Sequence, residues 1–190
     1  MTSHLAAATP PVWQVRCATA ADLPAIYQFY REVCAAIATT PYGPAWQWGI
    51  NPSEQILRRD LRQGKLVLGY AHAQLAAVGA LLPGEDPDYR GAAWQLPATD
   101  AEIGVLHLYA VHPHFRGRGI STKMLAAILA QAHADGQTVL HLDAIKGNVP
   151  AEKLYTAAGF RFAEERRVTM PQIGRLTLRL MERVTAASMQ

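Results

Sequence analysis

The apolar residues of this chain recur with two different periods, and each period predicts one kind of element. Residues 12–17 alternate apolar with polar side chains, which is the period of a half-buried strand. Between residues 23 and 38 the apolar side chains return every three or four positions, which predicts an amphipathic helix. Thr19 and Asp22 precede it with the spacing of a capping box, so we expect a helix to begin there.

Caps and helix breakers delimit a second helix before the next strands. Asn51 suits the N-cap, Pro52 the first helical position and Glu54 the third, and Gly64 stops the helix after residue 63. The remaining pattern predicts strands at 65–70, 75–82, 102–111, 138–143, 160–169 and 175–181, and helices at 117–135 and 149–158. This order predicts a mixed α/β layer in one domain, 1–190, with its core between about 10 and 184.

Two segments interrupt the regular pattern. Residues 39–50 combine two prolines, two glycines and three aromatic residues, so we expect an irregular segment with large side chains to place. Pro83–Thr99 is long and polar, and loops of this length are usually functional or mobile. Its acidic residues Glu85, Asp86 and Asp88 either draw a cation toward a pocket or belong to a solvated loop.

Composition and charge exclude several classes of protein. The chain has 190 residues, of which 50% are hydrophobic and 17% charged, so it is neither collagen-like nor disordered. No apolar run is long enough to span a bilayer, so we expect no membrane partner. The net charge of +3 comes with only short arginine clusters, which indicates no nucleic-acid partner. Two cysteines and an N-terminus without a signal peptide favour a cytoplasmic location.

A glycine-rich turn opens the helix expected after the long strand at 102–111. The run 116–121, Arg-Gly-Arg-Gly-Ile-Ser, leaves backbone N–H groups bare at a helix N-terminus, where the helix dipole favours a phosphate. The run lacks the third glycine of a dinucleotide-binding fingerprint and the Gly-Lys-Ser/Thr of a Walker loop. Without further motifs, this pattern would be equally compatible with a turn that binds nothing.

The further motifs make the chain resemble the GNAT superfamily of N-acetyltransferases. Arg116-x-x-Gly119-x-Ser121 fits the acetyl-CoA signature of that superfamily except at Ser121, where glycine or alanine is usual. The strand residues Leu108–Pro113 match the segment before the signature. A second conserved block matches at Leu142-Asp143, Asn148, Ala151, Leu154-Tyr155 and Gly159-Phe160.

The resemblance implies the fold and the acyl donor. We expect a mostly antiparallel central sheet of about seven strands, splayed between strands 4 and 5 and flanked by about four helices. Acetyl-CoA would lie in the splay, and its pyrophosphate would meet the helix start. The resemblance assigns cofactor binding to Tyr109, Ala110, Val111, Arg116, Gly117, Arg118, Gly119, Ile120 and Ser121. Asn148 either reaches the amide arm of the cofactor or serves only as an N-cap.

The resemblance also suggests catalytic groups. Tyr155 matches the tyrosine that protonates the leaving thiolate, although a tyrosine here could also only pack a helix on the sheet. Family members often carry a glutamate base where this chain has Val105. Strand alternation places Val105, His107, Tyr109 and Val111 on one face. We therefore expect His107 to act as the base, to orient the substrate or to be a core histidine, with Glu102 the second choice as base.

The acceptor is expected to be a small primary amine in an enclosed pocket. Tyr42, Trp46 and Trp48 either line that pocket or belong to the core. Two alternatives stay open: a peptide or protein N-terminus as acceptor, and an acyl-CoA-binding sensor without turnover. His112 and His114 have no third ligand nearby in sequence, so we expect surface histidines and no metal. A homodimer is possible, because superfamily members often pair.

Overall fold

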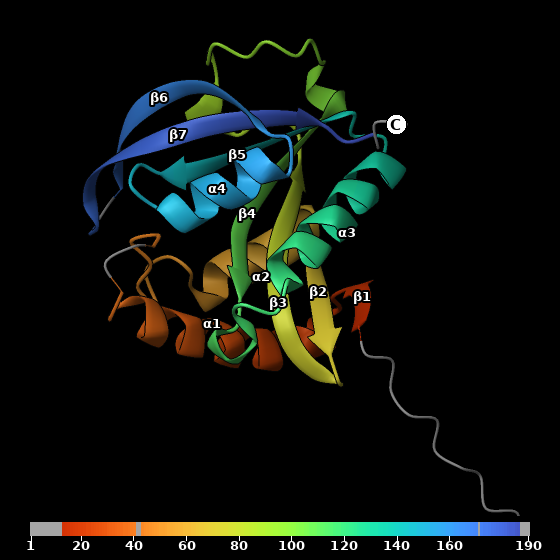
Figure 1. The fold of residues 1–190 in the computed structure, drawn as a ribbon, viewed down its shortest axis with the longest axis vertical. Coiled ribbons are helices and arrows are strands. Elements are labelled where there is room, and N and C mark those ends of the chain that lie inside the picture. Colours follow the sequence, from red (N-terminus) through yellow and green to blue (C-terminus); the bar gives the residue numbers. More distant parts are fainter. Residues whose placement is uncertain (1–12, 41–42, 171, 187–190) are drawn as a thin grey trace, which may run out of the picture.

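The computed structural model describes residues 13–40, 43–170 and 172–186. Short 3-10 turns at Ala20–Asp22, Pro87–Tyr89, Asp100–Glu102 and Pro113–Phe115 join the regular elements. These elements are, in chain order, β1 (Trp13–Cys17), α1 (Leu23–Ile37), α2 (Glu54–Gln63), β2 (Lys65–Ala71), β3 (Gln74–Pro83), β4 (Ile103–Val111), α3 (Ile120–Ala134), β5 (Val139–Ile145), α4 (Val149–Ala157), β6 (Arg161–Met170) and β7 (Gly174–Val184) (Figure 1).

The seven strands form one sheet in the order β1-β2-β3-β4-β5-β7-β6. Every neighbouring pair is antiparallel except β4 and β5, which run parallel. A parallel pair needs a crossover connection, and α3 supplies it between these two strands. The predicted fold class, a mostly antiparallel sheet with about four helices, is confirmed.

The helices cover the two faces of the sheet as separate layers (Figure 1). Figure 1 shows α3 and α4 in front of the sheet and α2 behind it. On the α3 face, side chains such as Met124 and Ile128 pack against Leu81 and Leu106 of the sheet. On the other face, α1 and α2 pack against Leu66, Leu68 and Val78, among others. Each helix thus buries one apolar stripe, as the sequence period predicts.

The starts of the first two helices follow their caps, with one correction. Thr19 and Asp22 form the predicted capping box, and α1 follows after one 3-10 turn. The prediction that Asn51 caps α2 is wrong, because the cap is Ser53, whose hydroxyl accepts the N–H of Ile56 at 3.3 Å. The carbonyls of Asn51 and Pro52 instead accept N–H groups of the preceding turn, so the helix begins two residues later.

The sheet opens between its two parallel strands. β4 and β5 pair only from Ile103 with Val139 to Leu106 with Leu142. Beyond Leu106 and Leu142 the two strands diverge, and we call this point the fork. Past the fork, β4 continues for five residues to Val111. Backbone groups of β4 beyond the fork therefore have no ladder partner on the β5 side. The predicted splay between strands 4 and 5 is confirmed.

A β-bulge lies at the fork and corrects one prediction. Ala80 pairs with His107 and Val78 with Ala110, so two residues of β4 stand opposite Gly79 alone. Leu108, one of the two, has a φ of 49°. The prediction that Val105, His107, Tyr109 and Val111 share one face is therefore wrong. His107 faces the α1/α2 side, as its partner Ala80 does, whereas Tyr109 and Val111 pack on the α3 side.

The long segment between β3 and β4 is held closely against the sheet. Tyr89 is 1% exposed and packs with Ile103, Val105, Leu178 and Leu180. Glu182 of β7 is fully buried, and its carboxylate accepts the N–H groups of Gln95 and Leu96 at 2.8 and 3.1 Å. Glu85 accepts the indole N–H of Trp94 and lies 3.1 Å from Nδ1 of His141 on β5. This loop is a structural layer of the fold.

No helix in the described ranges is long and apolar enough to cross a membrane.

Candidate active site

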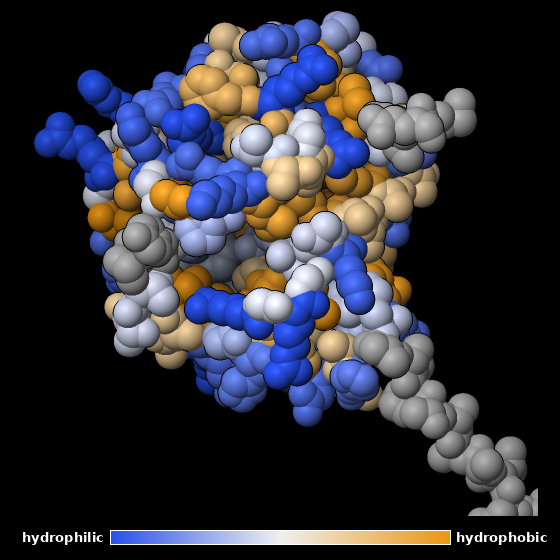
Figure 2. All heavy atoms as spheres, viewed as in Figure 1, coloured by the Kyte–Doolittle hydropathy of each residue, from blue (hydrophilic) through white to orange (hydrophobic). Residues whose placement is uncertain are grey.

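A cavity of about 740 Å³ lies against the fork. Its walls come from the segment between α1 and α2, from α2, from the 3-10 turn at Pro87–Tyr89, from β4 and β5, from α4 and from the β6–β7 hairpin. Figure 2 shows a hollow between the part of the molecule that carries α4 and the part that carries α1. A volume of this size suits a small molecule together with part of a larger one.

His107 lies on one wall of the cavity, in a hydrogen bond with a loop carboxylate. Its Nε2 is 2.9 Å from Oδ2 of Asp86, and both side chains are mostly buried. Burial disfavours the charged imidazolium, but the hydrogen bond to Asp86 and the charges of Asp143 and Asp86 outweigh it, so the pKa of His107 is raised. If Nε2–H donates to Asp86, Nδ1 keeps a lone pair that can accept a proton.

Asp143 is the neighbour of His107 across the fork, because both residues directly follow the last parallel pair. Its carboxylate accepts the hydroxyl of Tyr89. Burial raises the pKa of Asp143, although the Tyr89 hydrogen bond and the charge of His107 act in the opposite direction. For Asp86, burial is outweighed by the hydrogen bonds with His107 and with the N–H of Asp88, so its pKa is lowered. The pKa values of these two carboxyl groups are therefore shifted in opposite directions.

Tyr155 reaches the same cavity from α4, on the other face of the sheet. It is 6% exposed, and its ring packs near Tyr109 and Phe160 at centroid distances of 6.4 and 5.8 Å. No described residue makes a hydrogen bond to its hydroxyl. Burial, with a contribution from Asp143, raises the pKa of Tyr155 well above the ordinary value, so the phenol stays protonated at neutral pH.

The glycine-rich turn lies at the N-terminus of α3, which begins at Ile120 and not at Gly117 as predicted. Gly117 and Gly119 have φ values of 74° and 70°. This left-handed conformation is not helical, so both glycines lie before the first residue of α3. No side chain within the described residues caps α3, whereas Ser53 caps α2 and Asn148 caps α4. The first N–H groups of α3 therefore point to solvent, and the exposed Arg116 and Arg118 lie beside them.

Tyr109 connects this helix start to β4. Its hydroxyl donates to the carbonyl of Ser121 in the first turn of α3. Tyr109, Ala110 and Val111 lie on the part of β4 that has no partner in β5. Asn148 is confirmed as an N-cap, because its side chain accepts the N–H of Ala151 at 3.4 Å, and the residue also lines the cavity. The predicted cofactor-binding residues are thus arranged along one path.

The aromatic residues of the irregular segment have different positions. Trp46 lines the cavity, and its ring packs edge-on against Tyr30 at 5.9 Å. Trp48 does not line it; its ring packs against Tyr27 and under the guanidinium of Arg31. Trp46 is therefore a wall of the cavity and Trp48 part of the α1 core. Tyr42 lies outside the described residues.

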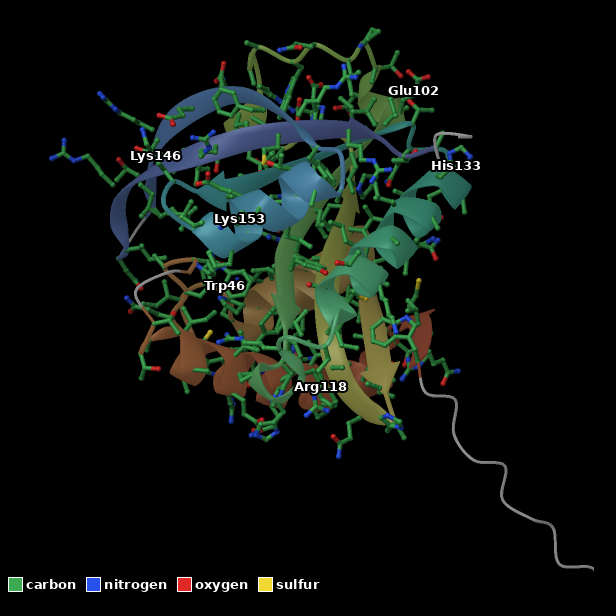
Figure 3. All side chains as sticks on the ribbon, in the orientation of Figure 1. Trp46, Glu102, Arg118, His133, Lys146 and Lys153 are labelled. Carbon is green, nitrogen blue, oxygen red and sulfur yellow. The ribbon has the colours of Figure 1, made fainter. Side chains whose placement is uncertain are left out.

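Glu102 is not part of this cavity. It lies in the 3-10 turn before β4, and its carboxylate accepts the N–H and the hydroxyl of Thr99 at 2.9 and 2.7 Å. Figure 3 places Glu102 at the top of the view, well apart from Trp46. The prediction that Glu102 lines the substrate pocket is wrong, since this capping box at Thr99 holds its side chain away from the cavity.

His112 and His114 also differ from expectation in part. His112 is 9% exposed and not a surface residue, because its Nε2 lies 2.7 Å from Glu32 of α1 and its ring packs on Phe29. His114 is exposed, as predicted. Within 13–40, 43–170 and 172–186, no group of three or more His, Cys, Asp or Glu side chains is arranged to hold a metal ion.

The cavity residues that the sequence did not assign to the site include the polar side chains of Asp60, Tyr89 and Asp143. Asp60 looked like an ordinary helix residue, and Tyr89 lay in a loop without a pattern. Asp143 was used only as part of a motif. No local signal marked Asp143, because only the register of the two parallel strands, which pairs Leu106 with Leu142, brings Asp143 level with His107.

Comparison with known proteins gives a family and a fold. The model of the Acetyltransferase (GNAT) family matches residues 23–160. An acetyltransferase of that family from Streptococcus agalactiae has a TM-score of 0.72 at 19% identity, covering 92% of this chain and 96% of that one. A ribosomal-protein-alanine N-acetyltransferase from Brucella melitensis has a TM-score of 0.62 at 22% identity, covering 90% and 99%.

Two further likenesses differ in extent. A Salmonella typhimurium protein described as an acetyltransferase, solved with its cofactor acetyl-CoA, has a TM-score of 0.62 at 18% identity, covering 95% of this chain and 98% of that one. In sequence, the chain is 29% identical over 119 residues to a catalase-peroxidase of Francisella tularensis subsp. novicida. That match covers 62% of this chain but spans only 13% of the length of the curated relative.

Proposed function

Because the chain belongs to the acetyltransferase (GNAT) family, we propose that it transfers the acetyl group of acetyl-CoA directly to the primary amine of a small molecule. One observation carries this proposal. The cavity lies at the fork and is lined by His107 from one face of the sheet and by Tyr155 from the other. A base and an acid on opposite sides of one opening are what direct amine acylation requires.

The acyl donor would be held along the path from the fork to the start of α3. The free edge of β4 at Tyr109–Val111 offers backbone groups to the amide arm of the donor, as an added strand would. The N–H groups at the start of α3, beside Arg116 and Arg118, suit the pyrophosphate. The hydrogen bond from the Tyr109 hydroxyl to the carbonyl of Ser121 connects the β4 edge to the start of α3. Asn148 has amide N–H groups left for the donor after capping α4.

Each bond change has a group within the cavity to support it. The amine nitrogen attacks the thioester carbon and loses its proton to Nδ1 of His107, whose Nε2 is held by Asp86. A backbone N–H near Ala110 and Val111 stabilises the oxyanion. The carbon–sulfur bond then breaks, and the thiolate takes a proton from the Tyr155 hydroxyl, which is protonated at neutral pH. The products are the amide and coenzyme A.

Calorimetric titration with acetyl-CoA, followed by a thiol-release assay with small amines and with peptides bearing free N-termini, tests the proposal. We expect binding and thiol release with at least one small amine. Release with peptides alone would assign the acceptor to the peptide class. Binding without release from any acceptor would favour a sensor, and absence of binding would overturn the assignment of the donor.

A paired substitution separates the pyrophosphate contact from the rest of the donor site. Replacing Arg116 and Arg118 with alanine should weaken coenzyme A binding by about tenfold and leave pantetheine, which lacks the pyrophosphate, unaffected. Arg62→Ala is the matched control, since Arg62 is exposed at the end of α2 and does not line the cavity. An equal loss for coenzyme A and pantetheine would contradict the proposed position of the pyrophosphate.

A further inference from the structure

The acceptor side of the cavity carries an excess of negative charge. Four carboxylates line it: Asp60 of α2, Asp86 and Asp88 of the loop after β3, and Asp143 of β5. Among the described lining residues, Arg59 is the one lysine or arginine. All four carboxylates belong to the side that faces α2 and the loop, where Trp46 and His107 also lie.

The partners of these carboxylates show which of them lacks a counter-charge. Asp60 is 1% exposed and paired with the guanidinium of Arg59 at 2.8 Å. Asp86 is paired with His107. Asp143 has only the neutral hydroxyl of Tyr89, and no described residue gives it a cation within ion-pair distance. Asp88 is exposed and likewise makes no ion pair with a described residue. Asp143 is thus the half-buried carboxylate that makes no ion pair with a described residue.

A second observation points to a ligand in the same place. The side chain of Tyr155 is only 6% exposed and lines the cavity near Asp143. Its hydroxyl has no hydrogen-bond partner among the described residues. Because this hydroxyl opens into the cavity, a bound ligand can complete its hydrogen bonding. The aromatic ring of Trp46 adds a surface that favours a cation.

We propose that the acceptor of this enzyme is an amine that carries a second positive charge, and that the carboxylate of Asp143 binds this second charge. The inference rests on the proposed function, since it names the substrate class of the same cavity. The second charge pairs with Asp143 while the first amine lies near His107 and gives up its proton.

The chemistry of the attacking amine explains why two charges suit this cavity better than one. An amine must be neutral to attack, and a site rich in carboxylates stabilises the unreactive ammonium form of a monoamine. In a diamine, one ammonium group pairs with the carboxylate. The charge of this group repels the second ammonium and so favours loss of a proton from the second nitrogen. A dication thus binds to the negative charge of the cavity while its attacking amine can still become neutral.

Three acceptors of matched length test the proposal: 1,5-diaminopentane, pentylamine and 5-aminopentanoate. Affinity is measured by calorimetry on the full chain with coenzyme A present, and kcat/KM by thiol release with acetyl-CoA. We expect the diamine to exceed pentylamine at least tenfold in both quantities and 5-aminopentanoate to be the weakest, and the preference should shrink as salt is added. Equal values for the diamine and pentylamine, or a preference for 5-aminopentanoate, would overturn the proposal.

Substitutions assign the preference to one carboxylate. Asp143→Asn keeps an oxygen for the Tyr89 hydroxyl and should reduce the diamine-to-pentylamine ratio at least fivefold. The matched control is Asp135→Asn, because Asp135 pairs with Lys65 beyond the end of α3 and does not line the cavity. Should Asp143→Asn fail to fold, Asp143→Glu keeps the charge but displaces it by one methylene, and this variant should also change the diamine-to-pentylamine ratio. An unchanged ratio in the folded variants contradicts the assignment.

The outcomes separate this inference from the proposed function. Preferential binding of the diamine without thiol release supports the charge preference and contradicts the transferase. Thiol release from all three acceptors without a preference supports the transferase and contradicts the charge preference. The dipeptide amides alanyl-lysine and alanyl-norleucine form a further pair, and a tenfold preference for the lysine form alone would place the second charge on a peptide.

Discussion

Oδ2 of Asp86 lies 2.9 Å from Nε2 of His107, so a residue of the loop after β3 holds an imidazole on β4. The two residues are 21 positions apart. The pKa of His107 therefore depends on a contact between two segments, the loop after β3 and the strand β4. The pair gives the cavity a histidine whose pKa lies above its ordinary value, and this shift can be measured.

The first prediction concerns the pH dependence of the reaction. Asp86 helps to raise the pKa of His107, and a base must be unprotonated, so kcat/KM should rise with pH through that raised pKa. Asp86→Asn removes the charge, lowers the pKa of His107 and should move the acidic limb of the profile about one pH unit lower. The measurement is the thiol-release rate between pH 5 and 9, as set by the assay buffers.

The control for this profile is Glu102→Gln. Glu102 caps the turn before β4 and lies outside the cavity, so the acidic limb should stay where it is in the unsubstituted protein. If Glu102→Gln moved the limb and Asp86→Asn did not, His107 would not be the base.

The second prediction concerns Tyr155. Tyr155→Phe removes the proton donor for the thiolate and should lower kcat about a hundredfold while leaving acetyl-CoA affinity nearly unchanged. The Tyr27 hydroxyl is also buried and has no hydrogen-bond partner among the described residues, but Tyr27 lies in the α1 core. Tyr27→Phe is therefore the matched control and should keep full activity. A normal kcat in Tyr155→Phe would show that the tyrosine only packs α4 on the sheet.

The third prediction concerns the position opposite the bulge. A Cβ on Gly79 would lie 2.8 Å from Cδ1 of Ile128 and 3.3 Å from the ring of Tyr109. Gly79→Ala should therefore lower the free energy of unfolding by about 1–3 kcal/mol, because the buried Ile128 side chain must change its rotamer or shift with α3. Denaturant titration gives this value.

A second substitution identifies the contact responsible. Ile128→Val removes Cδ1, so the double variant should recover part of the stability that Gly79→Ala loses. If the two losses simply added, the clash would not be with Ile128.

The fourth prediction concerns the layer formed by the loop after β3. Glu182→Gln leaves one of the two N–H groups of Gln95 and Leu96 facing an amide NH₂, and should cost about 2 kcal/mol. Hydrogen exchange at these two amides should become faster. The control is Glu164→Gln, whose carboxylate accepts the N–H of Ala93 in a more exposed place, where the loss should be smaller. Equal losses in both variants would argue against the importance of burial.

The local signals in the sequence predicted the elements of the fold well. The capping box at Thr19 and Asp22, the stop at Gly64 and the glycines before α3 act within a few residues, so the sequence alone reveals them. The position of the fork followed from the family resemblance. Asn51 failed as a cap because backbone hydrogen bonds to the preceding turn, which no local rule includes, hold it outside the helix.

The site was harder to predict, because its geometry depends on contacts between distant segments. The bulge at Leu108 reverses the alternation of β4, yet a leucine gives no sign of a positive φ. Asp86 was noted only as one of three loop acids, and its pairing with His107 depends on how the loop folds back. Asp60 and Asp143 meet the cavity from α2 and β5, so only the assembled layers show their relation.

The bulge gives β4 one residue more than its pleat requires. If Leu108 is left out of the count, His107, Tyr109, Ala110 and Val111 alternate regularly between the same two faces that they occupy now. The division of side chains between the two helix layers is therefore independent of the surplus residue. What depends on it is the direction of the backbone past the fork, and so the direction in which its N–H and C=O groups point. In this strand the extra residue changes the direction of the backbone, while Leu108 itself packs in the α1/α2 core.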